Sequence, residues 1–158
     1  MTVALLTVAL LMPGCGGSGD DGPCGPVRRE PLDPRAVHVV PGADPPEYKT
    51  EPPTSGPHLP SPSTQSVREE PISYAVQVGL LEEGIVLLQH RALSGDDRSR
   101  IEDLAGDAVT VAPAPSLPDD AKVVATAWVT KQVCDRVDVE ALRRFVDDNR
   151  DRGPDSHG

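Results

Sequence analysis

The sequence is poor in aromatic residues and has no excess of positive charge. Only four of its 158 residues are Phe, Trp or Tyr, so its core is expected to be mostly aliphatic and modest in size. Asp and Glu outnumber Lys and Arg by 25 to 15, which gives a net charge of −10. Because an acidic chain is repelled by phosphate backbones, this composition argues against nucleic acid as a partner.

No apolar run is long enough to cross a bilayer, which takes about 20 residues in a helix. The run at residues 2–12 (TVALLTVALLM) instead fits the apolar part of an export signal. It is followed by Pro13-Gly14-Cys15, a pattern that resembles a bacterial lipobox. This resemblance implies a signal peptide at residues 1–14 and a lipid on Cys15 that anchors the exported protein to the outer face of the cytoplasmic membrane. The alternative is that the run forms a buried strand or helix.

The sequence has only three cysteines, an odd number for an exported protein, in which thiols normally pair. Lipidation of Cys15 would leave Cys24 and Cys134 as partners. A bridge between them would close a loop of about 110 residues and contribute about 4–5 kcal/mol in the chain-entropy model. The alternative is that both thiols are free.

Fourteen of the eighteen prolines lie between Pro13 and Pro71, and they divide the chain into segments of different character. Residues 15–35 are rich in Gly, Pro and Asp and lack apolar periodicity, which predicts a flexible tether. Residues 36–153 are expected to form a single domain, followed by a disordered tail at residues 154–158. No internal repeat is visible.

From residue 72 onward the pattern is that of a folded domain. Alternating or continuous apolar residues predict strands at 72–78, 85–90, 108–112 and 122–130, with a further short edge strand at 38–40. A helix is expected to begin at Ser94 and end at Gly106, and Asp138 is the expected N-cap of a C-terminal helix that stops at Gly153-Pro154. The order of elements predicts an α+β fold, with a small mixed or antiparallel sheet of about four to five strands and two packed helices.

Several short motifs occur in a recognisable order. They are PPTSGPH at 52–58, LEEG at 81–84 followed by IVLL, ATAW at 125–128, and a terminal helix that ends in RGP at 152–154. Together they resemble the bacterial domain of unknown function 3105 family of secreted and membrane-anchored proteins, over roughly residues 37–155. This family has no established activity, so the resemblance predicts identity better than function.

The PPTSGPH motif has the composition of a built loop rather than of a flexible linker. Its prolines restrict their own φ angles and those of the residues before them. Gly56 permits a backbone conformation that other residues resist, and hydroxyl groups can close the turn by bonding to their own backbone. Such a loop would hold His58 in a defined direction, and the residues expected to shape it are Pro53, Thr54, Ser55, Gly56 and Pro57.

The resemblance implies that the family's second motif usually reads HxLEHG, where this chain has residues 79–84. In family members that keep the histidine of PPTSGPH and both histidines of HxLEHG, the two motifs look like a metal site, because neutral imidazole is a common ligand of zinc and copper. This chain has Gly79 and Glu83 where the second motif has histidines. The candidate metal ligands are therefore His58, Glu82 and Glu83, with His38 and His90 as additional ones. Glu83 would shift the preference toward harder ions, or the site has lost its affinity for metal. The other interpretation is that His58 is hydrogen-bonded and only stabilises its loop.

Motifs of well-known enzyme classes are missing from the sequence. It has no GxSxG, CxxC, HExxH or glycine-rich phosphate loop, and the Ser55–His58 pair lacks an evident orienting carboxylate. We therefore expect an exported, lipid-anchored binding protein that is not an enzyme, with copper or zinc as its metal if it binds one. The alternatives are a structural or interaction protein of the cell envelope without a ligand site, and, more distantly, a metal-dependent hydrolase. The sequence identifies no protein partner.

Overall fold

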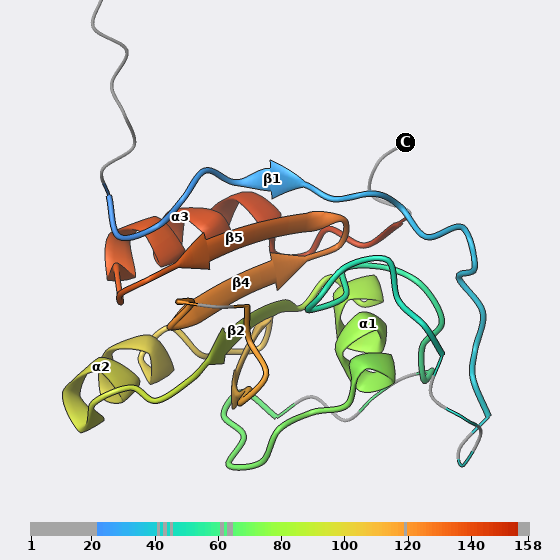
Figure 1. Cartoon of the computed structure of the whole chain (residues 1–158), viewed down its shortest axis with the longest axis horizontal. Coiled ribbons are helices and arrows are strands. Elements are labelled where there is room, and N and C mark those ends of the chain that lie inside the picture. Colours follow the sequence, from blue (N-terminus) through green and yellow to red (C-terminus); the bar gives the residue numbers. More distant parts are fainter. Residues whose placement is uncertain are drawn as a thin grey trace, which may run out of the picture.

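The computed structural model describes residues 22–40, 42, 44, 46–60, 62, 65–118 and 120–154. The segments predicted as signal peptide and tail, and the candidate lipidation site Cys15, lie outside the described residues, apart from Pro154. The described chain has an α+β fold, as the sequence predicts, with a five-stranded mixed sheet and three helices (Figure 1). None of these helices has the length and apolar character that crossing a bilayer requires.

The sheet is built around three neighbouring central strands. Its order is β1-β5-β4-β2-β3. Strands β2 and β3 are parallel, whereas the other neighbouring pairs are antiparallel. The strands are β1 (Arg28–Arg29), β2 (Val86–His90), β3 (Val109–Pro113), β4 (Val123–Ala127) and β5 (Thr130–Cys134).

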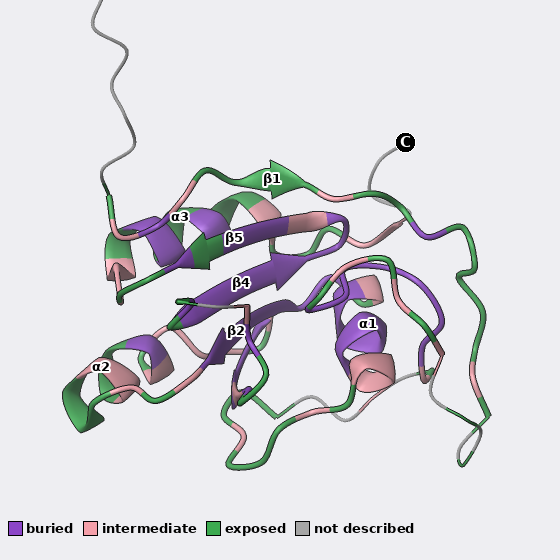
Figure 2. Ribbon diagram, viewed as in Figure 1, coloured by how far each residue is buried: buried purple, intermediate pink, exposed green. Residues whose placement is uncertain are grey.

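Helices cover both faces of this sheet, so β2 and β4 are buried along their whole length (Figure 2). On one face, Val86 and Leu88 pack with residues of α2 (Gly95–Glu102) and α3 (Val139–Asn149). On the other face, Leu87 packs with residues of α1 (Tyr74–Glu82). The alternation of side chains along β2 therefore divides the core into two layers.

The predicted helix starts are confirmed by their capping bonds. The Ser94 side chain accepts a hydrogen bond of 3.2 Å from the backbone N–H of Asp97 at the start of α2. The Asp138 side chain accepts one of 3.0 Å from the N–H of Ala141 at the start of α3. Each bond satisfies a donor that the first helical turn would otherwise leave unpaired.

The prediction of a strand at 72–78 is wrong, because this segment begins α1. The alternation of Ile72, Tyr74, Val76 and Val78 suggested one buried face, but α1 buries five consecutive residues, from Gln77 to Leu81. A helix that is apolar around its circumference shows no clear helical period in its sequence. Ala, Gln, Leu and Glu in this segment are also good helix formers, and tertiary packing selects that conformation here.

The prediction of one long strand at 122–130 is also wrong, because the chain reverses within it to form the β4–β5 hairpin. Its two turn residues are Trp128 and Val129, and Val129 has φ +49°. Tight hairpin turns favour Asn and Gly, and a β-branched residue rarely adopts positive φ. The turn therefore carries no recognisable signal in the sequence. The short edge strand expected at 38–40 is reduced to a single bridge between His38 and His58.

Residues 22–40, which we call the arm, pack on the domain, and this corrects the tether prediction for residues 22–35. The arm runs beside β5 through backbone bonds of 2.9 Å from Gly25 to Val133 and from Glu30 to Val129. The predicted Cys24–Cys134 disulfide is present and fastens its beginning. At the opposite edge of the sheet, Val67 pairs with Val111 of β3. Strands β5 and β3 are thus each flanked by a chain segment from another part of the sequence.

An ion pair between a buried Asp33 and a half-exposed Arg35 holds the middle of the arm. Asp33 is 0% exposed, and its carboxylate accepts hydrogen bonds of 3.0 and 2.6 Å from the Arg35 guanidinium. These bonds hold the pKa of Asp33 below its ordinary value. A bidentate pair of this kind is geometrically specific, so it fixes the course of the arm toward His38.

Candidate metal site

The PPTSGPH loop is buried from Pro52 to His58, and it is bonded to the β4–β5 turn and to the arm. The Thr54 carbonyl accepts a bond of 3.0 Å from the N–H of Val129. The Ser55 hydroxyl accepts one of 2.8 Å from the N–H of Asp33. Gly56 has φ +125°, where an L side chain would be strained, and a Cβ there would lie 3.2 Å from the Asp33 carboxylate. The loop and the arm therefore pack closely against each other.

The last residue of this loop, His58, is 1% exposed, and its ring has a defined tautomer when neutral. Nδ1 lies 3.0 Å from the Gly56 carbonyl oxygen. A carbonyl oxygen can only accept, so Nδ1 carries the proton and Nε2 of the neutral ring carries a lone pair. Metal-bound histidines commonly have this arrangement, in which a backbone carbonyl orients the ring and raises the basicity of the other nitrogen.

Glu82, the last residue of α1, provides a carboxylate next to this nitrogen. Its Oε2 lies 2.5 Å from Nε2 of His58. This distance is short, yet Nε2 has no partner in hydrogen-bonding geometry among the described residues. The side chain of Glu82 is 31% exposed, so it has access to solvent. The pair thus brings an imidazole nitrogen and a carboxylate oxygen, both of them potential metal ligands, to the same point.

His38 on the arm completes a group of three candidate ligands. Its backbone segment pairs in parallel with that of His58, through bonds of 2.8 Å from Val39 to His58 and 3.0 Å from His58 to Val37. The two rings meet edge to face, with centroids 5.0 Å apart. One ligand atom each from His38, His58 and Glu82 all lie within 4.8 Å of one another.

Comparison with protein families decides the identity of the chain. A model of the family described as "Protein of unknown function (DUF3105)" matches residues 40–158. The chain belongs to the DUF3105 family. This confirms the resemblance that the motifs suggested. No curated protein and no solved structure is significantly similar to the chain.

The structure explains one of the two departures from the HxLEHG motif of the DUF3105 family. A Cβ at position 79 would overlap the carbonyl oxygen of Leu59 and approach the Pro62 ring to 3.2 Å. The segment after His58 therefore rests directly on α1, and it also bonds to it at 3.0 Å, from the N–H of Leu59 to the Ala75 carbonyl. With the loop in this position there is no room for a histidine at position 79.

Two other predicted ligands lie outside the group of three. Glu83, at the second departure, is the exposed C-cap of α1 and does not join the cluster. His90 is at the far end of β2, about 13 Å along the strand from its start. Burial lowers the pKa of His90, and the positive charge of Arg98 on α2 acts in the same direction. His90 therefore belongs to the α2 side of the core.

From the sequence, His38 was predicted only as an additional ligand, whereas the structure places it among the three clustered residues. Its partner in the pairing, His58, is 20 positions away, and no periodic pattern connects the two segments. The usable signal was a histidine in an apolar stretch, His38-Val39-Val40, between clusters of prolines. Long-range pairing of this kind is set by tertiary packing and cannot be read from local propensity.

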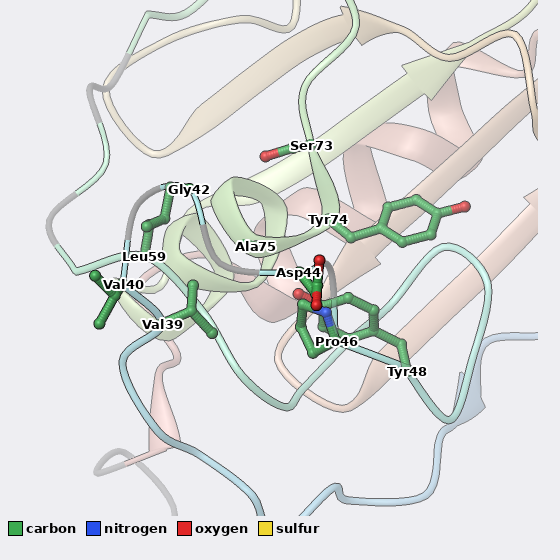
Figure 3. Close-up of a pocket in the computed structure, with 10 residues that line it drawn as sticks. All are labelled: Val39, Val40, Gly42, Asp44, Pro46, Tyr48, Leu59, Ser73, Tyr74 and Ala75. Atoms are coloured by element: carbon green, nitrogen blue, oxygen red, sulfur yellow. The ribbon is translucent and has the colours of Figure 1, made fainter.

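A cavity of about 280 Å³ lies beside this pairing but is separate from the histidines. Val39 and Leu59 line it, and each directly follows one of the paired histidines. Adjacent residues in extended chains point to opposite sides, so the cavity and the metal candidates lie on opposite sides of the pairing. Figure 3 shows Val39 and Val40 at one end of the cavity and the Tyr48 and Tyr74 side chains at the other.

Hydrogen bonds hold the two tyrosines of this cavity in place. Their rings meet edge to face with centroids 5.6 Å apart. The Tyr48 hydroxyl donates to the Pro57 carbonyl at 2.9 Å, and that of Tyr74 donates to the Glu51 carboxylate at 2.5 Å. Burial, followed by the bond to Glu51, raises the pKa of Tyr74 to about 12, so this phenol keeps its proton at neutral pH.

Proposed function

We propose that this DUF3105 protein is an exported, lipid-anchored domain that binds a transition-metal ion through His38, His58 and Glu82. The observation that carries the proposal is the convergence of two imidazoles and one carboxylate within 4.8 Å, from three different parts of the chain. The Gly56 carbonyl bond supports it further, because it leaves Nε2 of the buried His58 as an acceptor.

The ligand types favour zinc or copper. Imidazole suits both ions, whereas magnesium and calcium prefer sites made of oxygen ligands. Ligand bonds of about 2.0–2.2 Å place neighbouring ligand atoms about 3–4 Å apart. Nε2 of His58 and Oε2 of Glu82 are 2.5 Å apart. A rotation of the Glu82 side chain that moves Oε2 away from Nε2 by about an ångström would therefore admit the ion. Its partial exposure allows this movement.

The test is a calorimetric titration of the metal-free protein with Zn²⁺ and with Cu²⁺. We expect one ion to bind per chain, and His58→Ala and Glu82→Gln each to weaken binding at least about tenfold, since even indirect partners of metal ligands contribute that much. Glu83→Gln is the matched control, because it removes the neighbouring carboxylate that lies outside the cluster. It should leave the affinity unchanged.

Two outcomes would reject the metal site. One is that the wild-type protein takes up neither ion stoichiometrically. The other is that Glu82→Gln and Glu83→Gln lose the same affinity, which would indicate nonspecific binding to an acidic surface. His58 would then only brace its loop against α1, and the protein would be better described as an interaction protein of the cell envelope.

The location is tested through Cys15. We expect the wild-type protein in its bacterial host to fractionate with membranes, and Cys15→Ser to shift it to the soluble or secreted fraction, since a thiol is needed for the first lipid. Ser18→Ala serves as the control, because it changes a residue close to the predicted cleavage site and leaves all three cysteines in place. Membrane association that persists in the Cys15→Ser protein would contradict the lipid anchor.

A further inference from the structure

A second cavity, of about 370 Å³, lies between the arm, β5 and the segment around Glu51. Its charged lining residues are Arg28, Glu30, Glu51 and Lys131, and it shares no residue with the candidate metal site. Its volume is at the lower end of the range of small-molecule pockets. An occupant would therefore be a small molecule.

Lys131 is the unusual residue of this cavity, because it is a lysine that is only 6% exposed. Its ammonium group has three N–H donors. One reaches the Glu51 carbonyl at 3.2 Å, while the Glu30 carboxylate, at 3.9 Å, is too distant for a hydrogen bond. Two donors therefore have no acceptor among the described residues. Burial lowers the pKa of this amine, which reflects the incomplete compensation of its charge.

Arg28 adds a second positive charge to the same wall. It lies directly opposite Lys131 in the antiparallel β1–β5 pair, so the two side chains share one face of the sheet. Like charges in this position are destabilising. The Arg28 guanidinium also has no hydrogen bond or ion pair with any residue that the structure describes. Both groups are therefore free to bind an anionic group in the cavity.

Glu30 and Glu51 place negative charge in the same lining. The Glu51 carboxylate accepts the Tyr74 bond, whereas the Glu30 carboxylate is 17% exposed and has only the distant contact with Lys131. A phosphate or sulfate ion would be attracted by the two cations but repelled by these carboxylates. A ligand that carries both signs of charge would satisfy the two cations and the Glu30 carboxylate.

We propose that this cavity binds a small zwitterion, a free α-amino acid, with its carboxylate on Lys131 and Arg28 and its ammonium toward Glu30. Two charge-assisted bonds to the carboxylate complete the donors that Lys131 leaves open. The site is independent of the proposed metal function, because none of its residues contributes to the three-ligand cluster.

The experiment is a calorimetric or NMR titration of the full chain with its disulfide intact. EDTA is present to chelate metal ions, so that an amino acid cannot bind through a metal. The probes are L-alanine, L-leucine and L-glutamate, with acetate, ethylamine and inorganic phosphate as single-charge comparisons. We expect at least one amino acid to bind with one site per chain, and the single-charge probes to bind at least tenfold more weakly.

Substitutions of the lining residues test whether the amino acid binds in this cavity. Arg28→Gln changes an exposed side chain, so it should leave folding intact and weaken the amino acid at least tenfold. Lys131→Gln should do the same. Arg29→Gln is the matched control, since Arg29 pairs with Thr130 on the opposite face of the sheet and should have no effect. The proposal is overturned if none of the amino acids binds, if acetate or phosphate binds as tightly, or if Arg28→Gln and Arg29→Gln behave alike.

Discussion

Replacing Cys24 and Cys134 together with alanine is expected to lower the free energy of unfolding by about 4–5 kcal/mol. The disulfide joins residues 110 positions apart. Breaking it therefore increases the conformational entropy of the unfolded chain over most of the domain. The core has few aromatic residues to offset such a loss, since the sequence contains one Phe and one Trp. Equilibrium denaturation in urea measures the change.

The control for this variant is the wild-type protein in a reductant, which should unfold at the same urea concentration as the double variant. An independent readout is the protease sensitivity of the arm, whose beginning the disulfide fastens beside β5. A loss below about 1 kcal/mol would show that the arm bonds and the Asp33–Arg35 pair hold the segment without the disulfide.

Replacing Gly79 with alanine is expected to destabilise the protein by about 1–3 kcal/mol, the usual cost of overpacking. The new methyl group would overlap the Leu59 carbonyl oxygen, so either the loop or α1 must move. Helix propensity alone predicts the opposite sign, because alanine stabilises a helix interior by about 1 kcal/mol relative to glycine. The sign of the change in unfolding free energy therefore decides between close packing and propensity.

Gly95→Ala is the matched control for Gly79→Ala. Gly95 is also in a helix, the first residue of α2, but a Cβ there meets nothing within 4 Å. It should be neutral or slightly stabilising. Because the segment that Gly79 supports directly follows His58, Gly79→Ala should also weaken the proposed metal binding, whereas Gly95→Ala should not. Equal effects of the two variants would mean that the contact with Leu59 is not restrictive.

The sequence predicted the central part of the candidate site because the relevant constraints are local. Prolines, hydroxyl groups and Gly56 within seven residues indicated a built loop, and the family motif linked His58 to Glu82. The choice between Glu82 and Glu83 could not be made in advance. It depends on where α1 ends, and the segment was expected to be a strand.

What the sequence did not reveal depends on pairing between distant segments. The arm looked like a tether because its composition is that of a linker, yet it packs through backbone bonds, which leave no mark in side-chain periodicity. The hairpin turn at Trp128-Val129 lacked turn residues for a related reason. The Val129 N–H bonds to the Thr54 carbonyl at 3.0 Å, so the loop beside it supports the unusual backbone.

The two segments that flank the sheet affect intermolecular association of the protein. The arm runs beside β5, and the pairing of Val67 with Val111 occupies part of the outer side of β3. Free N–H and C=O groups on a bordering strand invite intermolecular β-pairing and aggregation. Neighbouring molecules are therefore protected from such polymerisation along β5 for as long as the arm stays docked.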